Sequence, residues 1–452
     1  MLGIRGFAAL SLILLSPISS SAESLDVIFS HPTCQAHVYA NPLPTFSGGV
    51  VPGKAANSYC TEDDYDTASI KSAPSFVRLK ALIDDTRNTK FVAAYFIFSE
   101  DAVVDAICQR HIRSPISMTL FLQQGSIEPN AVAQRVGPNS TEASARKLQA
   151  CLGPALQLRW VGCGWFVPGI RCPQGKISTL HHKYWRFEGA SQDVSYVLGS
   201  GNIGQSLYAN FDNWNFVATT RTSALDSQLR CMIEPIQSST ELTERILRSE
   251  YQSCLRASKA HGLALPIASM LMPATRLDFL LSQLDTKLAD AETITLITQD
   301  IGGKQIANFL SKHAIAGRTV RILLGDDWYW SSFGLDVGVA RTNKVRWLEE
   351  LVRASGGRIV VRYLELNHHS SFRPSLHHKL LVAKKSNGLQ FALVTTSNWD
   401  DASFRGNLET VHFINDPKWA VPYVVEADRL WSLAMEAGGL PIVDVQPPRR
   451  GK

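Results

Sequence analysis

The sequence predicts an α/β protein of two similar lobes, each built on a mainly parallel sheet with helices on its faces, related by a pseudo-twofold axis. The 452-residue chain is 45% hydrophobic and 19% charged, enough to bury a large core and to form two domains. Strand and helix patterns alternate along it, as in βαβ units. The pattern Leu-His-His-Lys occurs once in each half, at residues 180–183 and 376–379, after the same order of elements. Repetition of a pattern together with its surroundings indicates a duplicated domain.

The first half alternates buried apolar runs, which favour strands, with amphipathic segments, which favour helices. A Ser-Thr pair at 140–141 is placed to cap the second helix. The expected elements are strands at 90–98, 117–123 and 155–161 and helices at 102–113 and 143–152. Residues 23–64 are rich in Pro, Gly and Asn, so we expect an irregular lead-in held by Cys34 and Cys60.

The second half repeats this order of elements. Strands are expected at 293–298, 319–324 and 358–364, and helices at 304–313 and 344–354. Gly and Pro interrupt the pattern at 257–273, so we assign residues 23–262 to the first lobe and 263–452 to the second.

The first 22 residues have the layout of a cleaved secretory signal. Arg5 precedes an apolar run at 7–15, and a series of small residues ends at Ala22. An uncleaved membrane anchor is the alternative, although the apolar run is short for a bilayer. No later stretch is long and apolar enough to span a membrane. We therefore expect a soluble protein that is secreted or periplasmic.

The cysteines agree with an oxidising compartment, because their number is even and they can pair. All eight lie in the first half: Cys34, Cys60, Cys108, Cys151, Cys163, Cys172, Cys231 and Cys254. We expect disulfides in the first lobe, where pairing of Cys163 with Cys172 would stiffen a Gly/Pro loop ahead of the first motif. Zinc is the competing interpretation, but no Cys-x-x-Cys spacing supports it. The net charge of +5 is spread along the chain and permits an anionic partner without requiring one.

The repeated motif carries the candidate catalytic groups. In each copy a His is followed two residues later by a Lys, so on a strand both side chains share a face and the middle His points the other way. An Asn follows each first His by 21 residues, after a turn of small residues. The six residues are His181, Lys183, Asn202, His377, Lys379 and Asn398. At a pseudo-twofold interface each half would supply one of each type at its strand ends, where α/β sheets place ligands.

Two imidazoles, two ammonium groups and two amides at one point suit a tetrahedral phosphate. The lysines and asparagines would neutralise and orient the phosphoryl oxygens, which other enzymes do with a metal ion, so we expect neither metal nor cofactor. One neutral imidazole can attack phosphorus in line while the other, protonated, gives its proton to the departing oxygen. Water then reverses the roles. Histidine suits both tasks because its ordinary pKa lies near neutrality.

The motif resembles that of the phospholipase D superfamily: His-x-Lys, four residues, Asp, a variable gap and Gly-Ser-x-Asn. The resemblance begins near residue 90 and implies a duplicated phospholipase D-like fold, two α/β/α lobes with one shared active site, and metal-independent phosphodiester cleavage through a phosphohistidine. It places Ser200 and Thr396 at motif positions, which we assign to substrate binding, and Glu409 in an Asn-x-Glu element that supports a catalytic histidine. The chain departs from the motif where its Asp is Glu188 in the first copy and Lys384 in the second.

The carboxylate that follows each motif sets an expectation for the two histidines. Glu409 follows the second motif, and Asp212 follows the first in a similar element set one residue closer. A carboxylate bonded to the far nitrogen of an imidazole stabilises its protonated form. Asp212 is shorter, which makes its contact the less certain of the two. If Glu409 supports His377 in its own half, His377 is the general acid and His181 the nucleophile, as the resemblance also implies. The alternative is that Glu409 pairs with Arg405 or a lysine on the surface.

We expect a secreted monomeric phosphodiesterase that hydrolyses a phospholipid head group and contacts the membrane surface. An exported nuclease acting on DNA or RNA is the first alternative, which the lack of a basic tract disfavours. An inactive phosphate-binding module is the second, which retention of both motifs disfavours. Aromatic residues at 326–333 can rest on lipid or stack on bases, and His368-His369 can bind a metal, but packing and solvation explain them as well.

Overall fold

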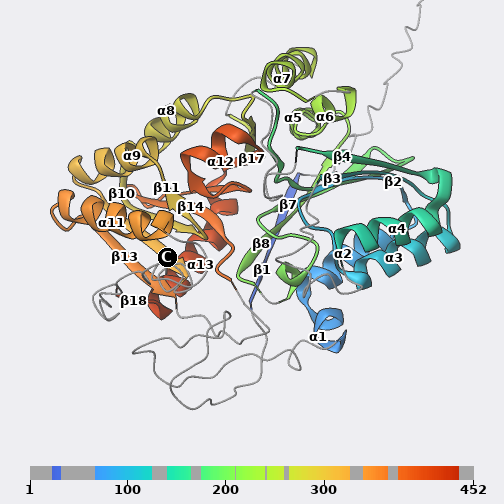
Figure 1. Ribbon diagram of the computed structural model, residues 1–452, viewed down its shortest axis with the longest axis horizontal. Helices are drawn as coiled ribbons and strands as arrows, with labels where there is room; N and C mark the ends of the chain where they lie inside the picture. Colours follow the sequence, from blue (N-terminus) through green and yellow to red (C-terminus); the bar gives the residue numbers. More distant parts are fainter. Residues whose placement is uncertain are drawn as a thin grey trace, which may run out of the picture.

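The computed structural model describes residues 23–31, 67–124, 140–163, 175–208, 210–239, 242–258, 264–325, 339–364 and 375–436. Two large sheets lie side by side, one mainly from each half of the chain, with helices on their outer faces (Figure 1). The expected α/β class, with one sheet for each half, is confirmed. The lobe boundary at residue 262 remains a prediction.

The first sheet has the order β1-β8-β7-β6-β2-β3-β4. Its strands are β1 (Ser24–Ser30), β2 (Asn88–Tyr95), β3 (Ser117–Gln123), β4 (Leu156–Val161), β6 (Lys183–Gly189), β7 (Asp193–Gly199) and β8 (Asp212–Thr220). Helices α2 (Pro74–Asp84), α3 (Asp101–Arg113) and α4 (Thr141–Leu152) cover one face, with the short α1 (Thr67–Ser72) beside them (Figure 1). The predicted cap is confirmed, since the Ser140 hydroxyl accepts a hydrogen bond from the Ala143 amide at 3.0 Å.

The second sheet has the order β18-β13-β12-β10-β14-β15-β17-β5, and β9 also pairs with β17. Its strands are β5 (Thr179–Leu180), β9 (Ile267–Met272), β10 (Ala291–Thr298), β12 (Thr319–Gly325), β13 (Ile359–Leu364), β14 (Lys379–Lys385), β15 (Gln390–Thr395), β17 (Asn407–Ile414) and β18 (Met435–Glu436). The larger helices of this half are α8 (Leu277–Lys287), α9 (Lys304–Ile315), α11 (Val339–Ala354) and α13 (Pro417–Leu433), the last packed on β14 and β15. A small sheet joins β11 (Ile301–Gly302) to β16 (Trp399–Asp400), next to α12 (Asp401–Gly406).

The expectation of mainly parallel sheets is corrected by the strand pairing. Strands β2, β3 and β4 are parallel, as are β10, β12 and β13, and helices connect them. The strands that follow each motif are antiparallel to one another. Their connections, such as 190–192 and 386–389, are too short for the crossover that a parallel pair requires. Each half is therefore a mixed sheet.

The expected irregular lead-in is also corrected. Residues Ser24–Ser30 form β1, which pairs antiparallel with β8 at the sheet edge. Apolar residues alternate along β1, and Leu25, Val27 and Phe29 pack against the buried core. Residues 32–66, with Cys34 and Cys60, lie outside the described residues, as does the predicted signal at 1–22.

Two of the expected disulfides are confirmed. Cys108–Cys151 joins α3 to α4, and Cys231–Cys254 joins the end of α5 (Ala224–Arg230) to α7 (Glu244–Ser258). Cys163 is also disulfide-bonded, and its expected partner Cys172 lies outside the described residues. No helix in the described ranges combines the length and apolarity needed to cross a membrane.

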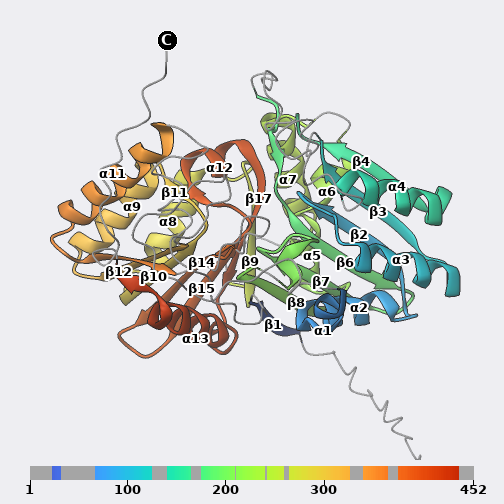
Figure 2. The ribbon, with the colours of Figure 1, turned by 60° about the horizontal axis from the view of Figure 1, so that its bottom comes forward.

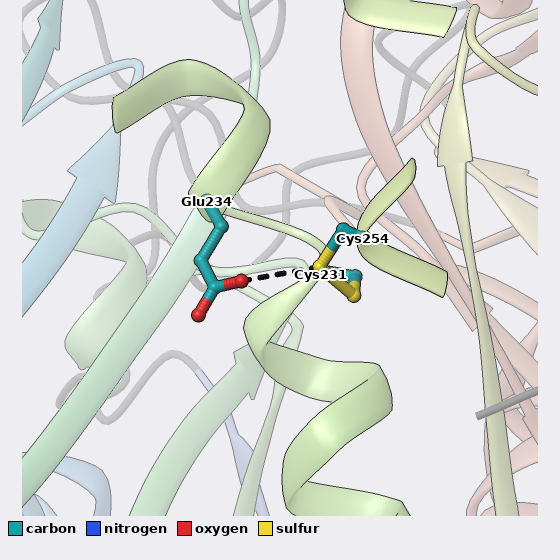
Figure 3. A group of neighbouring side chains, drawn as sticks. All are labelled: Cys231, Glu234 and Cys254. Atoms are coloured by element: carbon teal, nitrogen blue, oxygen red, sulfur yellow. Dashed lines mark hydrogen bonds between the residues drawn. A yellow bond between two sulfur atoms is a disulfide. The ribbon is translucent and has the colours of Figure 1, made fainter. Parts of the chain in front are cut away.

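One group among the described residues has the spacing of a metal site, which bears on the zinc alternative. Cys231, Glu234 and Cys254 place a sulfur or oxygen atom within 4.8 Å of one another. The two sulfurs are bonded to each other at 2.01 Å (Figure 3), so neither is free as a thiolate ligand.

Candidate active site

The two His-x-Lys motifs lie at the border between the halves. Strand β17 lies between the two halves (Figure 2). It begins beside β5, so that Leu408 pairs with Leu180. The His181 amide donates to the Leu408 carbonyl at 2.9 Å, and the His377 amide donates to the Phe211 carbonyl at 3.0 Å. Each motif is therefore held by the segment that enters the carboxylate-bearing strand of the other half.

The carboxylates reach across the same border. Nδ1 of His181 lies 2.9 Å from Oε2 of Glu409, and Nδ1 of His377 lies 2.8 Å from Oδ1 of Asp212. Glu409 therefore supports the histidine of the other half, because β17 is paired with the strand before His181, and the condition under which His377 would be the acid is not met. Asp212 makes an equally short contact despite its shorter side chain. The two histidines thus have the same kind of partner, and the difference in support that would make His377 the acid is absent.

Two small hydroxyl residues fix the carboxylates. Ser200 donates to Oδ1 of Asp212 and Thr396 donates to Oε2 of Glu409, both at 2.6 Å, and both side chains are fully buried. We expected these residues to bind substrate, but the structure directs their hydroxyl protons to the carboxylates behind the histidines. Glu409 also accepts a hydrogen bond from the side-chain amide of Asn407 at 3.1 Å. Oδ2 of Asp212 is buried and has no hydrogen-bond partner among the described residues.

The middle histidines face away from the site, as expected. His182 is fully buried, with its ring nitrogens 3.2 Å from the Leu408 carbonyl and 3.1 Å from the Met232 carbonyl. His378 is also fully buried, and its Nδ1 lies 3.3 Å from the Asn213 amide of the other half. The contacts of His182 with Leu408 and of His378 with Asn213 join the two halves behind His181 and His377.

The lysines and asparagines complete the site. Lys183 donates to the carbonyl of His181 and Lys379 to that of His377, each at 2.9 Å, so each ammonium folds back over its own histidine. The Asn202 carbonyl oxygen accepts from a backbone amide at 3.4 Å. The corresponding oxygen of Asn398 is buried without a hydrogen-bond partner in the described part of the chain.

Burial dominates the electrostatics of the site. It lowers the pKa of both His181 and His377 to about 4, against the opposing effect of their carboxylates. It lowers the pKa of Lys379 to about 8 and that of Lys183 well below its ordinary value. Lys379 also disfavours protonation of His181, so the groups of the two halves act on one another. Burial opposes ionisation of Glu409, but its histidine and lysine neighbours outweigh this and hold its pKa below the usual range.

Three residues of the site were not assigned to it from sequence. Asp212 follows the first motif at nearly the same spacing as Glu409 follows the second, and this spacing is the sequence signal that could have identified it. Phe96 follows β2 and packs edge-on against His181 at 5.2 Å between ring centroids, with the Lys183 ammonium 5.8 Å from its ring. Gln299 follows β10 in the corresponding position and accepts from Lys379 at 3.3 Å. No pattern in the sequence identifies Phe96 or Gln299.

The arrangement is suited to acid–base and nucleophilic chemistry on an anion. Each histidine has Nδ1 fixed by a carboxylate, so its other ring nitrogen is directed away from that carboxylate. The side chains of His181 and His377 are 14% and 9% exposed, which leaves them accessible to a small reacting group. Two buried ammonium groups beside them supply a positive field in a site of low dielectric.

Comparisons with known proteins find similarity in part of the sequence and in the fold. Residues 285–431 match a family model described as cardiolipin synthase, PLD-like domain. A phosphatidylserine synthase from Haemophilus influenzae Rd KW20 is similar in structure, with a TM-score of 0.54 and 14% identity over 81% of this chain and 86% of that chain. The low identity limits this likeness to the fold.

Two further solved structures align with lower TM-scores. Yeast tyrosyl-DNA phosphodiesterase aligns with a TM-score of 0.47 and 13% identity over 75% of this chain and 87% of that chain. The polyphosphate kinase of Porphyromonas gingivalis aligns with a TM-score of 0.44 and 10% identity over 79% of this chain, which spans 49% of the kinase. A comparison with curated proteins finds no match.

Proposed function

Because residues 285–431 match a PLD-like domain, we propose that the chain is a member of the phospholipase D superfamily and hydrolyses phosphodiesters through a phosphohistidine at the site shared by its halves. The observation that carries the proposal is the crossed pairing of His181 with Glu409 and of His377 with Asp212. Two imidazoles fixed in this way, between two buried ammonium groups, match the needs of a two-step displacement at phosphorus.

In the first step, Nε2 of His181 attacks phosphorus and forms a P–N bond. The P–O bond to the departing alcohol breaks, and protonated His377 gives its proton to that oxygen. Lys183 and Lys379 neutralise the phosphoryl oxygens, and Glu409 stabilises the positive charge that develops on His181. Binding of the anionic phosphate favours the protonated form of His377, which burial alone disfavours.

In the second step, neutral His377 takes a proton from water, which attacks phosphorus and breaks the P–N bond. The products are a phosphomonoester and an alcohol, and both histidines return to their starting states. The choice of His181 as nucleophile follows the family resemblance, since both histidines have equivalent carboxylate support.

We propose a phospholipid as the substrate, cleaved at its head-group phosphodiester. The modest net charge of +5, spread along the chain, does not favour a polyanionic nucleic acid. The names of the matching family model and of the Haemophilus influenzae structure both refer to phospholipid synthesis, which supports this choice.

A side-by-side assay tests the proposal. Purified protein is incubated with vesicles from a phosphatidylcholine-based head-group panel and with single-stranded DNA, and released head group, phosphatidate and nucleotides are measured. Head-group release that is lost in both His181→Ala and His377→Ala supports the proposal. DNA cleavage with the same dependence would make the protein a nuclease, and no turnover of either substrate would leave a phosphate-binding module.

We also propose that the protein is exported and acts as a monomer at a membrane surface. Its disulfides are compatible with an extracellular or periplasmic location. Amino-terminal sequencing of protein recovered outside the cytoplasm should begin at Glu23; a start at Met1 in that fraction would contradict cleavage of a signal.

A further inference from the structure

A charged cavity in the first lobe lies apart from the active site. It has a volume of about 300 Å³ and is formed by the ends of β2 and β6 with α5 and the start of α6 (Glu234–Ser238). Seven charged side chains line it, four cationic and three anionic: Lys90, Arg186, Arg221, Arg230, Glu188, Asp226 and Glu234. Its lining thus carries one positive charge in excess.

The cavity cannot share the phosphate of the active site. Lys183 and Glu188 lie on the same strand, β6, five residues apart. At the rise of an extended strand they are separated by roughly 17 Å. A small anion bound between the lysines of the site is therefore out of reach of this lining.

The duplicated fold does not require these charges. Arg186 and Glu188 lie five and seven residues after His181, and the corresponding positions after His377 are Val382 and Lys384. Val382 is buried in the core, so the same place in the second sheet is filled by a simple apolar side chain. Arg186 is only 8% exposed, and burying a charge is costly where a hydrophobic residue would fit. The charged lining is therefore an addition to the first lobe and not a consequence of the fold.

The lining is held in place but not fully hydrogen-bonded. Arg186 contacts Glu188 at 2.6 Å and Asp226 at 3.4 Å, which fixes the floor. Nε of Arg221 is buried, has no hydrogen-bond acceptor among the described residues, and lies 3.9 Å from the nearest carboxylate, that of Glu188. Nε of Arg230 is likewise buried without an acceptor in that part of the chain, although Asp226 lies 3.2 Å away. Both guanidinium groups are therefore only partly hydrogen-bonded within the described residues, which is rare for buried donors.

A disulfide supports the outer side of the cavity. Glu234 accepts from Arg230 at 3.0 Å, and its second carboxylate oxygen lies 3.1 Å from the sulfur of Cys254 (Figure 3). Cys254 is bonded to Cys231, the residue that follows α5. Arg221 and Arg230 are 34% and 36% exposed, so a small ligand has access from solvent.

We propose that this cavity binds a small oxyanion of the phosphate or sulfate type, held by the guanidinium groups of Arg221 and Arg230 and the ammonium of Lys90. Arginine offers paired donors that match such an anion, and the excess positive charge favours it. The proposal does not depend on the reaction proposed above.

Calorimetric titration with orthophosphate, and in parallel with sulfate, tests the proposal. The full-length protein carries Lys183→Ala and Lys379→Ala, so that phosphate no longer binds at the active site, and ionic strength is held constant with chloride. One anion per chain should bind. Arg221→Gln and Arg230→Gln should each weaken binding about tenfold or more, as expected for a lost charge-assisted hydrogen bond. The control Arg146→Gln removes an exposed i,i+4 ion pair on α4 and should leave binding unchanged.

A variant that should strengthen anion binding distinguishes a specific effect on the cavity from a general loss of structure. Glu188→Gln removes a negative charge from the lining and should tighten orthophosphate binding about threefold or more. The inference is overturned if neither anion binds in the lysine-free background, if Arg146→Gln weakens binding as much as Arg230→Gln, or if Glu188→Gln weakens it.

Discussion

The crossed carboxylates predict which residues act as a unit. Glu409→Gln keeps the shape of the side chain and removes the charge that lies 2.9 Å from Nδ1 of His181. With charge centres about 4 Å apart and an effective dielectric constant of about 20, that charge stabilises an imidazolium by about 4 kcal/mol. The amide of Gln recovers part of this through a neutral hydrogen bond. We therefore expect phosphoenzyme formation to slow by roughly 100- to 1000-fold.

The assay uses a nitrophenyl phosphodiester, whose leaving group needs little acid assistance, and measures the first turnover by release of nitrophenolate. In a His377→Ala background, Glu409→Gln should slow the first turnover by the full factor of roughly 100 to 1000. It should cost less than about threefold in a His181→Ala background, because groups that act as a unit are not additive. Asp212→Asn should show the reverse pattern.

A matched control is Glu188→Gln, another buried glutamate, which lies on β6 and lines the charged cavity apart from the site. It should change the first-turnover rate little. The opposite result would be a large slowing of the first turnover by Glu409→Gln in the His181→Ala background and a small one in the His377→Ala background. Glu409 would then support the histidine of its own half in solution, and the crossed arrangement would be refuted.

Three further predictions follow from the site and its surroundings. Activity should persist in excess chelator, because the lysines supply the positive field; loss that zinc, magnesium or calcium restores would contradict this. kcat/KM should fall as pH rises above about 8, where Lys379 loses its proton, and a profile that stays flat well above that pH would contradict the role of its charge. The free energy of unfolding, measured by denaturant titration, should decrease as pH falls below about 6.5. In the folded state His181 and His377 have pKa values of about 4, so below pH 6.5 the unfolded state binds protons that the folded state does not. Unfolding midpoints that rise on acidification would contradict this.

The features that the sequence determined are local or repeated. Helix α4 begins at its predicted cap because Ser140 bonds to an amide three residues away. Strands β3 and β12 agree with the predicted 117–123 and 319–324 to within a residue, because buried apolar runs between turn residues set them. The motif residues of the candidate site could also be predicted, since two motifs with equal spacing leave few residues to choose from.

The features that tertiary structure decided join residues far apart in the chain. His181 and Glu409 are 228 residues apart, and His377 and Asp212 are 165 apart, so spacing within one half carried no information on their pairing. The motif position of Ser200 and Thr396 predicts that they bind substrate. Their burial behind the carboxylates is visible only in the folded structure. Likewise, β1 is a strand because β8 offers it an unpaired edge and a core to cover, although its sequence context favours a loop. These pairings depend on which sheet edges and buried charges come into contact when the halves pack. Local sequence patterns do not specify those contacts.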